Sequence, residues 1–169
     1  ANRTAQERGL AARHRRVDIE CLALGERFDG AFCWGNSFGY KDHEGCRAFL
    51  AGVYGCLKNR ASFVLDTGMA AESILPHLEE RAVYEAAGIM MELENHYLAG
   101  KSCLVTEFIF RRGSQEERKT ARQYVFTVAE IIRMLEMAGL RVQCLYAGTD
   151  REPYRVGSHR LILTSCKMD

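Results

Sequence analysis

Polar side chains that could bind a small molecule stand at three separated places in the sequence. Asp18 precedes Ile19 in a short segment, Asn36 and Ser37 follow an apolar run, and His96 stands in a mixed apolar and polar segment. A carboxylate can accept hydrogen bonds from an amine, whereas amide, hydroxyl and imidazole groups can bind an amine or a hydroxyl. These groups form one site only if the fold brings the three places together.

The elements expected around Asn36 form a strand, a helix and a second strand. Residues 28–34 (FDGAFCW) are a compact apolar run that suits a buried strand, and Gly35-Asn36-Ser37 breaks it. A helix is expected from Asp42, its N-cap, to residue 57, followed by a turn over 58–60 and a buried strand over 61–66. A crossover helix of this length predicts that the two strands are parallel.

The rest of the chain predicts antiparallel strands and one more strong helix. A short helix is expected over 70–78, and β-forming residues fill the segment 82–126, with a charged connection over 111–120. We expect this segment to be an inserted antiparallel β unit. Thr127 and Glu130 have the spacing of a capping box, and the helix that they begin precedes two final strands.

The composition limits which kinds of partner and binding site the chain is expected to have. The chain has 169 residues with 47% apolar side chains, enough for one domain over 1–169. Its 23 basic and 22 acidic residues predict neither nucleic-acid nor membrane binding, and no apolar run could span a bilayer. Seven scattered cysteines without a Cys-x-x-Cys pair predict no metal site and favour reduced thiols in a cytoplasmic protein.

Three stretches carry a family resemblance when they are taken in order. They are Asp18-Ile19-Glu20 with the run 28–40, then the approach 56–58 with the strand 62–66, and last the stretch 124–140 (YVFT to AGL). Together they resemble class I S-adenosylmethionine-dependent methyltransferases of the small-molecule type: an acidic residue after the third strand, the fourth and fifth strands, and the segment before the last two strands. The resemblance covers nearly all of the chain.

The resemblance implies an α/β fold, a Rossmann-like methyltransferase sheet truncated at its N-terminus, with appended antiparallel strands. The sequence contains neither the family's glycine-rich loop nor the acidic residue that holds the ribose of the cofactor. We therefore expect the chain to be the C-terminal portion of the domain, with roughly 60 residues, two strand–helix units, before Ala1. A methyltransferase of this kind would use S-adenosylmethionine and a small-molecule methyl acceptor. These 169 residues alone would have impaired methyltransferase activity.

The resemblance also assigns candidate residues. It places cofactor contacts at Asp18, with its neighbour Ile19 against the purine, and along the loop 33–37, listed as Cys33, Trp34, Gly35, Asn36 and Ser37. Asp18 could instead be a surface residue in a turn, and Gly-Asn-Ser is also ordinary loop composition. Trp34 suits the core as well as a pocket wall.

Candidate acceptor-binding residues are Phe38, Tyr40 and His96. His96 and its neighbours could equally lie on a solvated face of the appended strands or at an oligomer contact. No catalytic residue is assigned, because methyl transfer from a sulfonium depends mainly on proximity and alignment.

Two functions remain open. The first is an enzyme that methylates a small molecule, and the second is a non-catalytic binding or dimerisation module with a vestigial cofactor cleft. Apolar strand faces in the regions 16–34 and 89–112 predict a homo-oligomer in either case.

Overall fold

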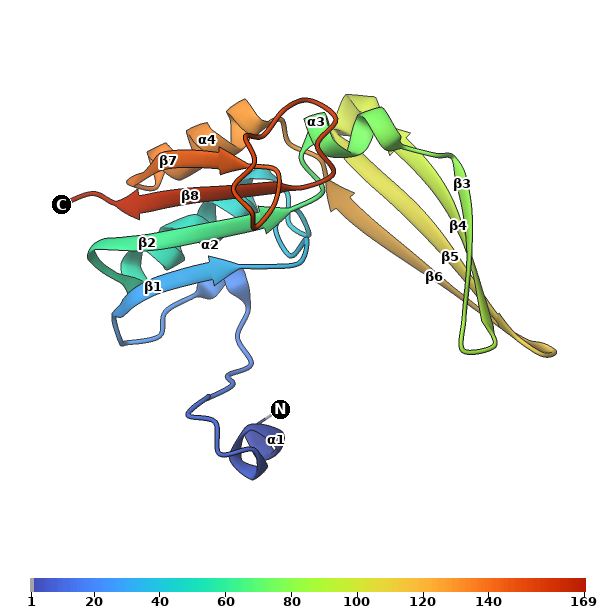
Figure 1. Ribbon diagram of the computed structural model, residues 1–169, viewed down its shortest axis with the longest axis horizontal. Coiled ribbons are helices and arrows are strands. Elements are labelled where there is room, and N and C mark those ends of the chain that lie inside the picture. The colour runs from blue at the N-terminus through green and yellow to red at the C-terminus, as the bar shows by residue number, and fades with distance from the viewer. Residues whose placement is uncertain (1) are drawn as a thin grey trace.

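The computed structural model describes residues 2–169 and contains two four-stranded sheets (Figure 1). The mixed sheet has the strand order β1-β2-β8-β7, and the appended sheet has the order β3-β4-β5-β6. In chain order the elements are α1 (Asn2–Glu7), η1 (Ile19–Cys21), β1 (Phe28–Cys33), α2 (His43–Cys56), β2 (Leu57–Thr67), α3 (Ala71–Ile74), η2 (Leu75–His77), β3 (Arg81–Ala86), β4 (Ile89–Leu98), η3 (Ala99–Lys101), β5 (Cys103–Arg112), β6 (Gln115–Tyr124), α4 (Val128–Met137), β7 (Leu140–Tyr146) and β8 (Leu161–Lys167).

The parallel pair predicted from the sequence is present. β1 and β2 pair in parallel, with Cys33 opposite Leu65, and α2 is the crossover between them. The predicted turn over 58–60 is wrong, because the chain passes directly from α2 into β2 at Leu57. The Lys58 ammonium reaches across the strand pair and bonds the Asp29 carboxylate at 2.7 Å.

Two helices cover one face of the mixed sheet and bury its apolar side chains. The carboxylate of Asp42 accepts a hydrogen bond from the Gly45 N–H and caps α2, and Thr127 with Glu130 forms the predicted capping box of α4. Apolar residues from α2, α4, β2 and β8 form one core around the fully buried Phe63. On the opposite face Phe32 of β1 is 75% exposed, whereas Asp66 of β2 and Ile162 of β8 are buried.

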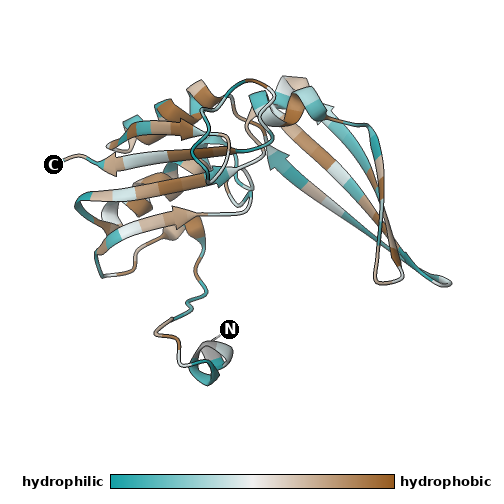
Figure 2. Ribbon diagram, in the orientation of Figure 1, coloured by the Kyte–Doolittle hydropathy of each residue, from teal (hydrophilic) through white to brown (hydrophobic). Residues whose placement is uncertain are grey.

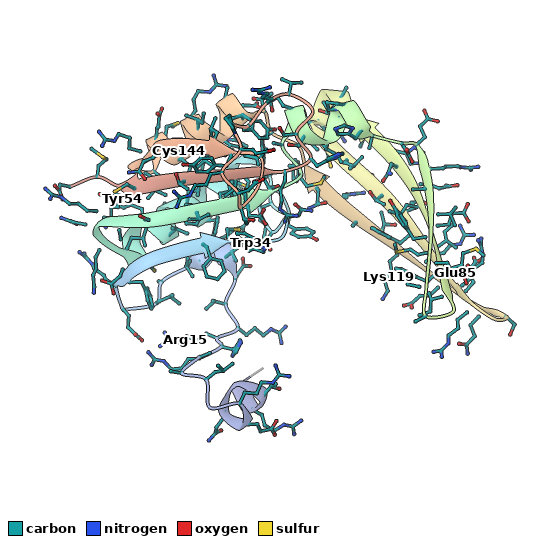
Figure 3. All side chains as sticks on the ribbon, viewed as in Figure 1. Arg15, Trp34, Tyr54, Glu85, Lys119 and Cys144 are labelled. Carbon is teal, nitrogen blue, oxygen red and sulfur yellow. The ribbon has the colours of Figure 1, made fainter. Side chains whose placement is uncertain are left out.

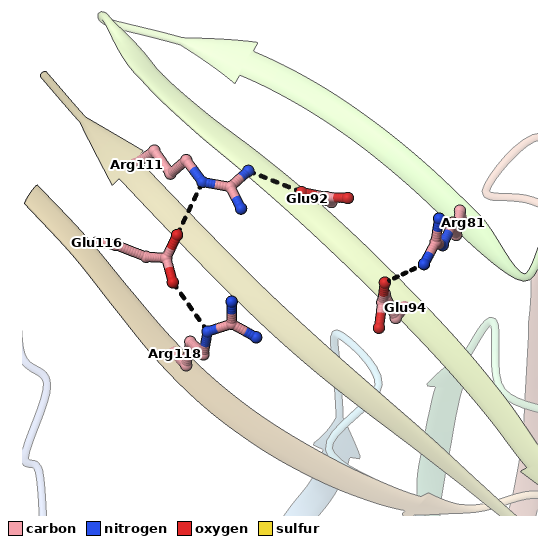
Figure 4. Close-up of polar contacts among 6 residues, drawn as sticks. All are labelled: Arg81, Glu92, Glu94, Arg111, Glu116 and Arg118. Carbon is pink, nitrogen blue, oxygen red and sulfur yellow. Dashed lines mark hydrogen bonds and ion pairs between the residues drawn. The ribbon is translucent and has the colours of Figure 1, made fainter. Parts of the chain in front are cut away.

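The appended sheet has two unlike faces. One face carries apolar side chains, including the stacked rings of Phe108 and Phe110, whose centroids lie 6.1 Å apart. The other carries the ion pairs of Figure 4, in which Arg111 bonds Glu92 at 2.7 Å and Glu116 at 2.9 Å. In Figure 2 the strand β6 is mostly hydrophilic, whereas β2 and β8 each contain a continuous hydrophobic stretch.

One expected boundary in this sheet is corrected, and the expected antiparallel segment contains a further hairpin. The segment 82–98 is a hairpin of two strands, because Ala87 and Gly88, at φ 53° and 71°, make its turn. The expected connection over 111–120 is itself strand, and only residues 113 and 114 separate β5 from β6. Opposite charges at Arg111 and Glu116 face each other in the pairing and stabilise it.

The chain crosses between the two sheets at Val125 and Phe126. Phe126 packs in the main core, and its carbonyl accepts a hydrogen bond from the Ala71 N–H at 2.9 Å. Val125, Met69 and Leu104 form a second small cluster where the appended sheet joins the body. No helix among residues 2–169 is both long and apolar enough to cross a membrane.

Candidate functional site

The site lies where β1 and β2 end. Because these strands are parallel, their carboxyl ends meet at one edge of the sheet. The segment 34–37 follows β1 there, next to Asp66 and Thr67 at the end of β2 and to Gly68 just after it. In an open α/β sheet, ligands bind in the crevice outside the carboxyl ends of the strands. Figure 3 shows Trp34 at this end of β1, on the side nearer the appended sheet.

The loop after β1 has two consecutive left-handed residues, Gly35 at φ 75° and Asn36 at φ 63°. The Gly35 N–H donates to the Asp66 carboxylate at 2.8 Å, and the Gly68 N–H donates to the Asn36 side-chain oxygen at 2.6 Å. The Asn36 carbonyl accepts a hydrogen bond of 3.0 Å from the side-chain amide of Gln123. A left-handed non-glycine residue is unfavourable on its own, so these bonds fix the loop in place.

Asp66 anchors the loop from within the sheet. Its carboxylate is fully buried and is bound through both oxygens by the Arg160 guanidinium, which stands directly before β8. Burial alone would raise the pKa of Asp66, but the hydrogen bonds from Arg160 and from the Gly35 N–H outweigh it and lower the pKa. Asp66 is therefore ionised at neutral pH, and its oxygens are already engaged.

The residues predicted to contact the cofactor from the loop come together at this edge. Cys33 is the last residue of β1 and is buried, and burial, with Cys46 and Asp66 nearby, raises the pKa of its thiol to about 11. Cys33 is thus a neutral wall residue and no nucleophile. Trp34 is 49% exposed, and the Ser37 hydroxyl donates to the Trp34 carbonyl at 3.0 Å. Nothing lies within 4 Å of the position that a Cβ of Gly35 would occupy.

Asp18 and Ile19 lie at the start of a short 3-10 helix and not at the end of a strand. The expectation that Asp18 ends a strand is wrong, since it is the N-cap of η1 and its carboxylate accepts from the Glu20 N–H. The mixed sheet as described ends at β1, so the segment around residue 18 has no strand to pair with. Lys41, four residues beyond Ser37, links Asp18 to the site loop through contacts of 3.6 Å to Asp18 and 3.2 Å to Glu20. Ile19 is half-buried.

The three predicted acceptor-binding residues are scattered. Phe38 is only 3% exposed and packs edge-on against Phe126, so its side chain belongs to the core. Tyr40 is 57% exposed, three residues after the loop 34–37. His96 is exposed on β4, two strands away from the strand of Gln123 in the appended sheet. Of the three, Tyr40 alone is exposed close to the loop 34–37 in the sequence.

Sequence reasoning missed three residues that build the site. Asp66 left a signal, a carboxylate that ends an otherwise apolar strand. Arg160 and Gln123 left none, because their partners are 94 and 87 residues away in the sequence. Among residues 2–169 there is no cluster of His, Cys, Asp and Glu that could hold a metal ion.

Comparison with known proteins identifies the fold. No family model matches the chain, and no curated protein matches it in sequence. Solved structures do match: an S-adenosylmethionine-dependent methyltransferase from Clostridium acetobutylicum aligns with all of this chain at a TM-score of 0.87 and 16% identity. The CcbJ methyltransferase from Streptomyces caelestis aligns with 90% of it at 0.79 and 15%. The sugar N-methyltransferase KedS8 from Streptoalloteichus aligns with 99% at 0.73 and 18%.

These likenesses show that the chain has the α/β, Rossmann-like fold of class I methyltransferases, with the appended antiparallel sheet. The chain spans 70, 62 and 67% of the length of these three proteins, in the same order.

Proposed function

We propose that the protein is an S-adenosylmethionine-dependent methyltransferase that acts on a small molecule. The observation that carries the proposal is the rigid left-handed loop Gly35–Asn36 at the carboxyl ends of the parallel strands, bonded from both sheets. That edge is where open α/β sheets bind ligands. The three solved structures compared above are methyltransferases, which supports the same activity here.

Part of S-adenosylmethionine fits the described residues. Trp34 offers a half-exposed aromatic face, Gly35 leaves open space beside the backbone, and Ser37 and Asn36 are short and polar. When bound, S-adenosylmethionine supplies a methyl group on a sulfonium. The residues of this chain contribute orientation: they hold the loop in one conformation and so fix the direction in which an acceptor approaches. Asp66 has no free oxygen for a ligand and acts as the anchor of the loop.

Affinity for S-adenosylmethionine in these 169 residues is expected to be weak. The sequence has no G-x-G-x-G loop to bind the methionine part and no carboxylate placed for the ribose. If each missing charged hydrogen bond contributes about 1.5 to 3 kcal/mol, the loss amounts to several kcal/mol. Calorimetric titration with S-adenosylmethionine measures it, and a micromolar Kd would contradict this expectation.

The methyl acceptor is proposed to be a small molecule with an amine or hydroxyl group. Tyr40 stands exposed next to the loop, and His96 offers an imidazole from the appended sheet. KedS8 is a sugar N-methyltransferase, so amino sugars are the first compounds to test. The assay incubates the protein with S-adenosylmethionine and amino sugars and measures S-adenosylhomocysteine by mass spectrometry. The proposal fails if the protein, extended by any residues that precede Ala1 in its natural chain, binds no S-adenosylmethionine.

A second function is a non-catalytic dimerisation module, and exposed apolar side chains on the appended sheet favour it. Val83 and Tyr84 of β3 and Met90 of β4 are all exposed. We propose a cytoplasmic homo-oligomer under either function, with no nucleic-acid or membrane partner, in which the region 16–34 or 89–112 meets a second chain. Sedimentation of dilute protein tests it, because a stable monomer would exclude the oligomer and with it the dimerisation module.

A further inference from the structure

The appended sheet contacts the site loop through the last two residues of one strand. The side-chain amide of Gln123 donates to the Asn36 carbonyl at 3.0 Å, and the Tyr124 N–H donates to the Gly39 carbonyl at 2.7 Å. Consecutive residues of β6 thus bond both ends of the segment 36–39. The loop that ends β1 is consequently attached to two sheets, and its partner in the appended sheet is far away in the sequence.

The polar groups of Asn36 are divided between the two sheets. Its side-chain oxygen is held by the Gly68 N–H of the mixed sheet, and its carbonyl is held by Gln123 of the appended sheet. Asparagine tolerates the left-handed conformation better than most residues, yet a single left-handed residue still needs support from its surroundings. If Gln123 is removed, the Asn36 carbonyl loses its partner and the loop keeps one anchor fewer.

Close approach of the two backbones is built into the same contact. Gly39 has φ 98°, and a Cβ on it would lie 2.7 Å from the Tyr124 carbonyl oxygen. Such a contact is too short for any real Cβ atom, and the neighbouring atom is backbone that cannot rotate away. β6 can therefore lie against the loop only because residue 39 has no side chain.

We infer that Gln123 is a positioning residue, through which the appended sheet sets the conformation of the loop 34–37. This inference rests on the proposed function only in taking that loop as the place of methyl transfer. The contact itself is a property of the fold, so movement of the appended sheet changes the geometry at the carboxyl ends of β1 and β2.

Trp34 provides a direct readout, because it is the only tryptophan of the chain and begins the loop. Gln123→Met keeps the side-chain length and removes the N–H donors. Gln115→Met is the matched control, since Gln115 is exposed at the far end of the same strand. We expect Gln123→Met to increase acrylamide quenching of Trp34 and to lower its fluorescence anisotropy, with Gln115→Met equal to wild type. Far-UV circular dichroism and the unfolding midpoint verify that both variants fold.

Gly39→Ala perturbs the contact from the other side and gives an independent check. The added methyl pushes β6 from the loop, so Trp34 should change in the same direction as in Gln123→Met. In an enzyme that methylates an amino sugar, Gln123→Met should lower kcat/KM roughly two- to tenfold, the effect of one hydrogen bond, mainly through kcat.

The outcomes separate this inference from the proposed function. A folded Gln123→Met with wild-type quenching and anisotropy of Trp34 overturns the inference, whatever the protein catalyses. If the fluorescence changes but kcat/KM does not, Gln123 is not a positioning residue. Changed fluorescence supports the contact even if the protein, extended by any residues that precede Ala1 in its natural chain, never binds S-adenosylmethionine, a result that would overturn the proposed function.

Discussion

The two sheets of the molecule are stabilised by different interactions. In the mixed sheet, Leu65 of β2 and Leu163 of β8 are fully buried, and two helices cover one face. In the appended sheet, most of β6 is exposed, and ion pairs between exposed side chains run across the strands. Burial of apolar area contributes far more to stability than exposed ion pairs do. The candidate site is formed where the rigid sheet meets the more loosely held one.

This difference bears on function because the loop 34–37 is anchored by two hydrogen bonds on the side of the mixed sheet and by one from the appended sheet. Asp66 belongs to the well-packed mixed sheet and Gly68 follows its strand β2, whereas Gln123 belongs to the appended sheet. Regions with few buried apolar contacts open locally at low free-energy cost. Motion of the appended sheet is thus expected to reach the site, whereas the frame around Asp66 stays fixed.

The largest expected effect compares one phenylalanine from each sheet. Phe63→Ala deletes a fully buried ring in β2 and should lower the free energy of unfolding by about 3–5 kcal/mol. Phe108→Ala removes a half-buried ring stacked on Phe110 and should cost about 1 kcal/mol. Urea unfolding measures both values. Equal losses would show that the two sheets are equally well packed and would remove the contrast.

The next effect concerns the buried anchor. Asp66→Asn keeps the shape of the side chain but removes its charge, leaving Arg160 without an ionised partner. Because the Arg160 side chain is 41% exposed and can be solvated, we expect a loss of about 2–3 kcal/mol, less than for a fully buried pair.

The pH dependence of this anchor has a definite sign. The pKa of Asp66 is lowered in the folded protein, so its stabilising contribution is complete above the unfolded value of 3.8 and is lost as the pH falls through the folded pKa. Acid unfolding followed by Trp34 fluorescence should therefore show a steeper loss of stability below pH 3.8 in wild type than in Asp66→Asn. Identical acid curves would mean that Asp66 does not anchor the folded state.

Local patterns in the sequence predicted the strand–helix–strand unit and the capped helix α4. These elements depend on neighbours in the sequence: Asp42 caps its own helix, and Thr127 with Glu130 caps another. The hairpin at Ala87 was missed, because a left-handed alanine gives no turn signal. The strand end at Asp18 was wrong, because a strand needs a partner that no local pattern supplies.

The candidate site shows the same limit more strongly. The loop 33–37 could be placed from its position after an apolar strand. Its anchors Arg160 and Gln123 could not, since a hydrogen bond between residues so far apart in the sequence depends on the packing of two sheets. Their residue types are ordinary for exposed positions, and only the folded chain gives them a role.

The smallest expected effect is a salt dependence confined to the appended sheet. Arg111 of β5 bonds Glu92 of β4 and Glu116 of β6, so the network joins three neighbouring strands. Hydrogen bonds to these carboxylates raise the pKa of Arg111. Ile109 lies opposite Glu92 in the strand pairing and is only 5% exposed. Raising the salt concentration screens such surface pairs. Amide hydrogen exchange read by mass spectrometry should then speed up in β4, β5 and β6 and stay unchanged in β2 and β8.

Arg111→Gln should reproduce the faster exchange at low salt and remove most of its salt dependence, because the central charge of the network is gone. Faster exchange of β2 in high salt, or an Arg111→Gln protein that responds to salt as wild type does, would show that the ion pairs do not set the stability of the appended sheet.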